Sequence, residues 1–196
     1  MKRRVVALSG ASGMIYAVRL VEWLVRHGHR IDLLVSRPAE KVFALEIGRV
    51  PADEKAWRKF FSDRRGLLKY HALNDFNSPL ASGSVKRDAM IIVPCSMGLV
   101  GRIAAGVSGN LLERAADIML KERRPLVLVF RETPLSLIHL ENLTNLSRAG
   151  AIVMPAAPGF YSRPKDLNEL ADGLVGRILK QVGIENNLEK EWGNGD

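Results

Sequence analysis

The stretch RVVALSGASGMIYAVRLVEWLVR, from Arg4 to Arg26, decides the fold. Its first apolar run, Val5 to Leu8, predicts a strand that is covered on both faces. Small residues follow from Ser9 to Gly13, and apolar residues then recur at helical spacing from Ala17 to Val25. Such a strand, loop and helix present N–H groups and the positive end of a helix dipole, which suit a phosphate. The alternative is a tight turn that binds no ligand.

The loop does not match the dinucleotide fingerprint. It reads G-A-S-G, from Gly10 to Gly13, where the fingerprint requires G-x-G-x-x-G. The second predicted strand, Ile31 to Val35, ends in Ser36-Arg37, so no carboxylate follows it to hold a ribose hydroxyl pair. This pattern disfavours NAD, whereas Arg37 leaves NADP open as a distant alternative, because an arginine can hold a 2′-phosphate.

The rest of the chain alternates strands and helices. Further strands are predicted at 67–73, 89–93, 126–130 and 151–154, and helices at 39–47, 51–65, 99–107, 110–122, 135–148 and 166–182. We expect Pro94 to end its strand, and Thr133 and Pro134 to cap and open the helix at 135–148. The alternation predicts an α/β fold, a three-layer doubly wound parallel sheet of Rossmann-like or flavodoxin-like type. One domain over 1–183 and a polar tail over 184–196 complete the expected organisation.

Composition narrows the class of ligand and the compartment. The 196 residues carry a formal net charge of +8, but the basic residues are spread along the chain, which favours phosphorylated small molecules over nucleic acid. No run of about 18 apolar residues occurs, so we expect no membrane span. The single cysteine, Cys95, suits a reducing cytoplasm. The four histidines have no metal-ligand spacing, so no metal site is predicted.

Several unusual residues are expected at one edge of the sheet. Ligands of such folds bind outside the carboxyl ends of the strands. The loops 10–13, 95–98 and 131–133 fall there, and Ser36 ends a further strand at the same edge. Within them, Arg131 could bind a phosphate or a flavin oxygen and Glu132 could act as acid or base, although a salt-bridged loop is the alternative. Cys95 is more simply a buried thiol than a nucleophile.

Five segments carry a resemblance to a known family. The run LKERRPLVLVFRETPLSLIHLENL (120–143) stands with SGASG (9–13), ASGS (81–84), PCSM (94–97) and GFYSRP (159–164). Together they resemble the UbiX-type flavin prenyltransferases, formerly called phenylacrylate or 3-octaprenyl-4-hydroxybenzoate decarboxylases. The resemblance covers the chain from about Arg4 to Ile184.

The resemblance implies an activity. Family members are flavodoxin-like, form a homododecamer and bind FMN across subunit contacts. They transfer a dimethylallyl group from dimethylallyl monophosphate to reduced FMN, without a metal ion, and the prenylated FMN serves a decarboxylase of the UbiD type. The alternatives are an FMN-binding accessory subunit and a flavin-dependent decarboxylase. A phosphate clamp favours the enzyme, because a carrier of FMN has no need of one.

The resemblance also implies roles for particular residues. The residues that match FMN-binding positions are Gly10, Ala11, Ser12, Ser36, Ser96, Met97, Gly98, Leu99 and Arg131. Those that match substrate-binding positions are Arg114, Lys121, Tyr161 and Arg177. Those that match catalytic positions are Glu46, Lys121, Glu132 and Trp192. Taken alone, Glu46, Arg114 and Arg177 look like ordinary surface residues. The chain departs from the family pattern at Gly98-Leu99 and over 156–162, which affects the second FMN loop and the prenyl pocket.

Overall fold

Six parallel strands form one sheet in the computed structural model, which describes residues 3–189. The strands are β1 (Arg3–Leu8), β2 (Arg30–Val35), β3 (Leu68–His71), β4 (Ala89–Cys95), β5 (Leu126–Phe130) and β6 (Ile152–Pro155). Their order across the sheet is β3-β2-β1-β4-β5-β6, so the winding reverses between β1 and β4. This reversal opens a crevice at the carboxyl ends of the strands, where doubly wound folds bind ligands. The predicted fold class is confirmed.

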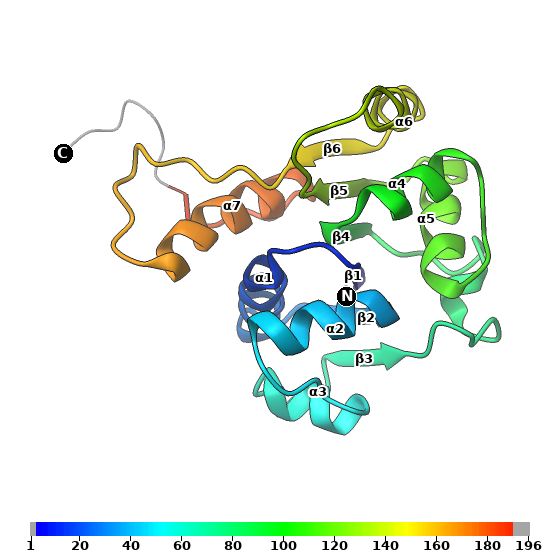
Figure 1. Cartoon of the computed structure of the whole chain (residues 1–196). Coiled ribbons are helices and arrows are strands. Elements are labelled where there is room, and N and C mark those ends of the chain that lie inside the picture. The colour runs from blue at the N-terminus through cyan, green and yellow to red at the C-terminus, as the bar shows by residue number, and fades with distance from the viewer. Residues whose placement is uncertain (1–2, 190–196) are drawn as a thin grey trace.

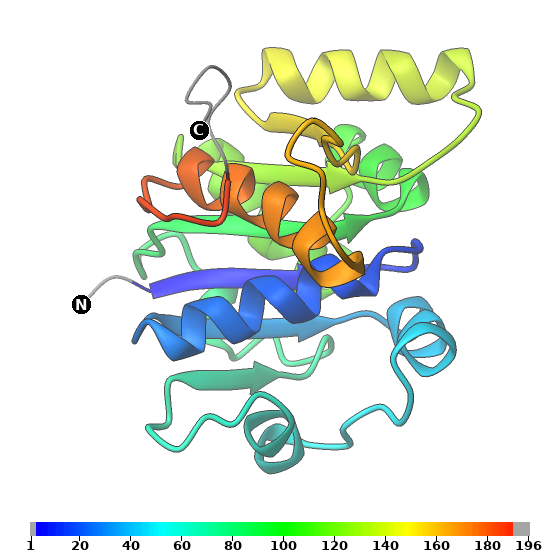
Figure 2. The same ribbon diagram turned by 90° about the vertical axis from the view of Figure 1, so that its left-hand side faces the viewer.

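Helices cover both faces of this sheet. They are α1 (Met14–Arg26), α2 (Arg37–Glu46), α3 (Glu54–Phe60), η1 (Pro79–Ala81), α4 (Met97–Ala104), α5 (Leu111–Lys121), α6 (Leu137–Arg148) and α7 (Leu167–Gln181). Figure 1 shows α1 and α7 on one side of the sheet and α4 and α5 on the other, with α6 beside the edge strand β6. In Figure 2 the strand arrows point toward the edge where the loops after β1 and β2 emerge.

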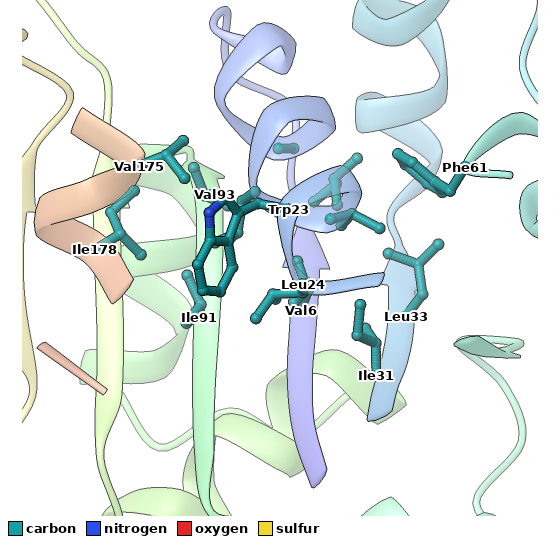
Figure 3. Close-up of a cluster of buried hydrophobic side chains, with 14 of the residues drawn as sticks. Val6, Trp23, Leu24, Ile31, Leu33, Phe61, Ile91, Val93, Val175 and Ile178 are labelled. Carbon is teal, nitrogen blue, oxygen red and sulfur yellow. The ribbon is translucent and has the colours of Figure 1, made fainter. Parts of the chain in front are cut away.

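Two apolar cores hold the layers together. Alternate residues of β1 point to opposite faces, so Val6 joins the core under α1 and α7 while Val5 joins the core under α4 and α5. Figure 3 shows the first core, where Trp23 of α1 and Val175 of α7 lie over the strands. Because both faces are covered, the strands read in the sequence as continuous apolar runs.

Two predicted elements differ from the structure in extent. The helix expected at 51–65 covers only Glu54–Phe60, because the side chain of Asp53 caps its start at 2.7 Å from the Ala56 N–H. The strand expected to stop at Pro94 continues to Cys95. Pro94 has no N–H to donate, but its carbonyl accepts a 3.1 Å hydrogen bond from the Ser9 N–H, and β4 pairs with β5 again at Cys95 after a register shift.

The predicted cap of α6 is also wrong. Ser136, rather than Thr133, caps the helix, which begins at Leu137. The Ser136 hydroxyl accepts from the His139 N–H at 3.2 Å, and His139 Nδ1 accepts from the Ser136 N–H at 3.3 Å. This reciprocal pair satisfies two amide groups at the helix start, an advantage that a threonine before proline does not offer.

A buried ionic network is centred on Asp32 of β2. Asp32, which is fully buried, accepts hydrogen bonds from Arg3 Nε at 2.8 Å and Arg87 Nε at 2.6 Å, and its other oxygen lies 2.7 Å from His71 Nε2. Ser78 Oγ lies 2.8 Å from His71 Nδ1, which ties the 74–85 loop to the network. Burial alone would raise the pKa of Asp32, but the His71 hydrogen bond and the Arg87 and Arg3 charges outweigh it and lower that pKa.

Candidate functional site

Two serines join the loops that follow β1 and β4. Ser9 Oγ accepts a 2.7 Å hydrogen bond from the Ser96 N–H, donates to the Pro94 carbonyl at 3.1 Å and lies 3.2 Å from Ser96 Oγ. The two residues are 87 positions apart in the sequence and meet because β1 and β4 are neighbours. The loops are therefore held together at the point where the sheet reverses its winding.

A cavity of about 230 Å³ lies beside this junction. Four of the predicted FMN-binding residues line it, namely Gly10, Ser36, Ser96 and Leu99. Further lining residues were not predicted: they are Ser9, Arg37, Pro38, Leu73, Arg102, Asn110, Leu112 and Glu113. The structure thus brings the ends of β1, β2 and β4 to one place, as the sequence predicts for this edge.

The lining of this cavity fits the phosphate and polyol part of FMN. Ser36 and Ser96 bring hydroxyl groups, and Arg37 and Arg102 bring positive charge. The first amide groups of α4, at Met97 and Gly98, open a helix whose N-cap residue makes no side-chain cap. A Cβ atom at Gly10 would overlap with Pro38 Cβ, so the close approach of this loop to the first turn of α2 requires glycine. The volume is below the roughly 300–1,000 Å³ usual for ligand pockets, so one chain does not enclose a whole flavin.

The remaining residues of the first loop lie at the start of α1. Ala11 is buried and Ser12 is half-buried. The amide groups of Gly13 and Met14 donate to the carboxylate of Glu46 at 3.0 and 2.8 Å. The N–H groups that we expected to be free are therefore capped, and Glu46 is more than a solvated surface residue. Since Gly13 has no side chain to cap the helix, α2 supplies the acceptor.

Arg131 and Glu132 emerge at the same edge, directly after β5. Both side chains are exposed, and the Arg131 backbone N–H donates to the Cys95 carbonyl at 3.3 Å. Glu132 Oε1 accepts from the Thr133 N–H at 3.1 Å, and no ion pair between Arg131 and Glu132 is formed in the described part of the chain.

Complete burial raises the pKa of Cys95 to about 12, so this thiol stays protonated and is no nucleophile.

A second, larger cavity of about 660 Å³ brings Tyr161 and Arg177 together. It lies between the end of β6, the 155–165 loop, α7 and the chain that follows α7. Arg177 Nη1 donates to Glu189 Oε1 at 3.1 Å, and Lys180 Nζ lies 3.2 Å from Glu189 Oε2. An arginine and a tyrosine hydroxyl in one open cavity can bind an oxyanion. The family resemblance assigned these two residues to one substrate site, and the structure places both in the lining of one cavity.

The structure does not bring Arg114 and Lys121 to either cavity within one chain. Both lie on α5, which packs on the face of the sheet opposite α7. Arg114 Nη1 pairs with Asp117 at 2.9 Å, and Lys121 Nζ pairs with Glu122 at 2.7 Å. Within one chain, the sheet therefore separates Lys121 from Tyr161 and Arg177, and a shared phosphate site needs Lys121 from another chain. Trp192 lies outside the described residues.

One charged pair of the first cavity gave no signal in the sequence. Arg102 Nε donates to Glu113 Oε1 at 2.6 Å, and Glu113 also accepts from the Gly109 N–H at 2.9 Å. Glu113 is buried while Arg102 is exposed. The two residues belong to different helices, α4 and α5, and no motif marks either of them. The one available signal is Asn110, a residue type that favours helix caps, whose side chain accepts from the Glu113 N–H at 3.0 Å and so marks the first turn of α5.

The described residues show neither a metal-binding cluster nor a membrane-spanning helix. Between residues 3 and 189, no group of three or more histidine, cysteine, aspartate or glutamate side chains could hold a metal ion. Over the same range, each helix is too short or too polar to cross a bilayer.

Comparison with known proteins gives a consistent relationship. A family model described as Flavoprotein matches residues 1–179. The flavin prenyltransferase UbiX of Halalkalibacterium halodurans is 46% identical over 189 residues, which cover 96% of this chain and 92% of that protein. The match therefore extends over both cavities and over the loop that carries Arg131 and Glu132.

Solved structures agree with this relationship. The structure of AnUbiX (PadA1) in complex with FMN and dimethylallyl pyrophosphate superposes with a TM-score of 0.89 at 36% identity, covering 100% of this chain and 99% of that one. A dodecameric FMN-dependent Ubix-like decarboxylase from Escherichia coli O157:H7 superposes with a TM-score of 0.86 at 34% identity, covering 98% of this chain and 100% of that one.

Proposed function

The chain belongs to the flavin prenyltransferase UbiX family of flavoproteins, and we propose that it transfers a dimethylallyl group from dimethylallyl monophosphate to reduced FMN. One observation supports this proposal above the others. The fold builds a small cavity of hydroxyl and amide donors at the switch point and, in the same chain, a second cavity that contains Tyr161 and Arg177. The first suits the cofactor and the second suits the phosphate of a prenyl donor.

The residues of the first cavity bind the cofactor. Ser36 and Ser96 offer hydroxyl groups, the 10–12 loop brings its backbone close, and Met97, Gly98 and Leu99 contribute the first turn of α4. Arg131 binds the cofactor from the exposed loop after β5. Reduced FMN supplies the nucleophilic ring nitrogen that accepts the dimethylallyl group.

The residues of the second cavity bind the leaving phosphate. The Arg177 guanidinium neutralises charge that develops on the phosphate oxygens, and the Tyr161 hydroxyl donates to them, so that the allylic carbon–oxygen bond can break without a metal ion. The indole face of Trp192 stabilises the allylic cation. Glu132 would act as a proton acceptor for the flavin from the loop after β5, and Glu46 orders the loop after β1 through its cap of α1.

The complete site requires neighbouring chains. Arg114 and Lys121 lie on the face opposite α7, so they reach the prenyl phosphate only from another subunit. Several large apolar side chains are exposed, as expected of surfaces that other copies cover: they are Leu137, Ile138, Leu140, Phe160 and Leu167. We propose a homododecamer, the assembly that the Escherichia coli O157:H7 structure names.

The proposal extends to the domain organisation of the chain, to its compartment and to the enzyme that uses its product. Residues 1–183 form the FMN-binding domain and 184–196 a tail that completes the site. The enzyme acts in the cytoplasm, and its product passes to a decarboxylase of the UbiD type, because a modified flavin is of use only to an enzyme that consumes it.

Mass spectrometry of the released flavin tests this function. Purified protein is incubated anaerobically with reduced FMN and dimethylallyl monophosphate, and parallel samples receive the diphosphate or no donor. We expect a flavin heavier by one dimethylallyl group with the monophosphate. Unchanged FMN with both donors, despite tight FMN binding, would instead identify an accessory subunit that carries the cofactor.

A further inference from the structure

The segment after α7 folds back onto that helix. Asn186 Nδ2 donates to the Gly176 carbonyl at 3.0 Å, and Ile184 is buried in the core. A Cβ atom at Gly176 would lie 3.0 Å from the Glu189 backbone nitrogen, so glycine permits this close approach. The contact places the Glu189 carboxylate between Arg177 and Lys180, which are neighbours on one face of the helix.

The Glu189 carboxylate forms an ion pair with Arg177, and the proposed function assigns Arg177 to the substrate phosphate. The Glu189 side chain is 12% exposed, and its two carboxylate oxygens lie 3.1 Å from Arg177 Nη1 and 3.2 Å from Lys180 Nζ. A phosphate dianion that binds Arg177 shares the guanidinium with this carboxylate, which already accepts from Nη1, and its negative charge is repelled by it.

The charges around the larger cavity favour an exchange of anions over the addition of one. Its cationic lining residues are Arg163, Lys165 and Arg177, and its carboxylates are Glu169, Asp172 and Glu189. Asp172 is bound to Arg19 at 2.6 Å, and Glu169 accepts from the Lys165 backbone N–H at 2.8 Å. A dianion that binds Arg177 would lie beside the Glu189 carboxylate, which is bound to the same guanidinium, and the two anions repel each other unless Glu189 leaves.

We propose that Glu189 is the exchangeable counter-ion of the phosphate subsite and thereby couples phosphate binding to the position of the tail. This inference rests on the proposed role of Arg177 in that function. In the free protein Glu189 neutralises Arg177 and keeps the 187–189 segment on α7. When a phosphate dianion binds Arg177, Glu189 leaves and the segment moves away from the helix. A monoanion is attracted to Arg177 too weakly to displace Glu189, so Glu189 makes the subsite selective for dianionic donors.

Binding measurements with inorganic phosphate test the exchange without any catalysis. We expect Glu189→Gln to bind inorganic phosphate about two- to fivefold more tightly than the parent protein, as suits a competitor held by a partly exposed ion pair. The matched control is Glu185→Gln, an exposed carboxylate of the same segment, and it should bind phosphate like the parent. Weaker binding by Glu189→Gln would overturn the proposal, because it would show that Glu189 orients Arg177 for phosphate.

Hydrogen–deuterium exchange reports the movement of the segment. We expect phosphate to accelerate exchange at residues 187–189 of the parent protein, and Glu189→Gln to exchange fast there with or without phosphate. Gly176→Ala, whose methyl group would displace the Glu189 backbone, should behave like Glu189→Gln. Unchanged exchange in the parent with phosphate bound would overturn the coupling. Faster exchange without prenyl transfer would leave the coupling standing and contradict only the proposed function.

Discussion

The carboxylate of Glu46, in the last turn of α2, accepts a 2.8 Å hydrogen bond from the backbone N–H of Met14, the first residue of α1. A second bond, from the Gly13 N–H at 3.0 Å, completes the cap. The helix that follows the cofactor loop is thus capped from a distant part of the chain. The loop from Ser9 to Gly13 consequently has a fixed start at Ser9 and a fixed end at Met14.

Replacing Glu46 should therefore loosen the start of α1. We expect Glu46→Ala to lower the free energy of unfolding by about 0.5–2 kcal/mol, the usual cost of losing a helix cap, and to weaken FMN binding. Urea denaturation and FMN titration measure the two effects. Glu141→Ala, at an exposed position in α6, is the control and should change neither. An unchanged stability of Glu46→Ala would show that the cap contributes nothing.

Arg177 lines the second cavity and Arg131 follows β5 on an exposed loop assigned to the cofactor, so we expect the two arginines to affect different ligands. Arg177→Ala removes a charged hydrogen-bond donor worth about 1.5–3 kcal/mol, so dimethylallyl phosphate binding to the FMN-loaded protein should weaken roughly ten- to a hundredfold. Arg131→Ala should weaken the binding of FMN by a similar factor. Titrations with each ligand measure both variants, with Arg148→Ala as an exposed control that affects neither. Equal losses of both ligands in each variant would contradict the assignment.

Burial makes Cys95 unreactive in the folded protein. Because burial raises the pKa of its thiol to about 12, almost no thiolate exists at pH 8.5. We expect iodoacetamide to alkylate the native protein at least about a hundredfold more slowly than the protein unfolded in guanidinium chloride. The chain has one cysteine, so intact mass reports this reaction directly. Similar rates in both states would show that β4 opens readily at its carboxyl end.

The Asp32 network predicts how stability depends on pH. The folded pKa of Asp32 lies below its usual value, so its contribution is complete above the unfolded pKa of about 3.9 and is lost as the pH falls through the folded value. Asp32→Asn leaves Arg3 and Arg87 without their carboxylate and should cost about 3–5 kcal/mol at pH 7. Unfolding free energies measured from pH 7 to pH 3 should fall less steeply at the acid end in this variant.

An exposed carboxylate provides the comparison for that pH series. Asp75→Asn, in an exposed loop, should retain both the stability of the parent and its dependence on pH. If Asp32→Asn were as stable as Asp75→Asn at pH 7, the buried network would contribute no net stability.

Local patterns in the sequence predicted the elements of the fold. The apolar run from Val5 to Leu8 is a strand, and the helical spacing that follows it is α1. Both patterns depend on residues that are close in the sequence. Burial on both faces makes each strand a continuous apolar run. The errors fell where the ends of elements depend on single side chains, as with the Asp53 cap of α3 and the Ser136 cap of α6.

The family and its chemistry were also predicted from the sequence, because the motifs of the loops are specific. The roles of individual site residues remain predictions. The sequence placed Gly10, Ser36 and Ser96 at one edge of the sheet, since parallel strands end on the same side.

By itself, then, the sequence determined the alternation of strands and helices, the edge where ligands bind and the family, because each is written in short-range patterns. The tertiary structure decided which distant side chains meet. It brought Glu46 to Met14 and Glu189 to Arg177, and it separated Lys121 from Tyr161 by the thickness of the sheet. Such contacts depend on how helices pack across the two faces, and no local pattern encodes that packing.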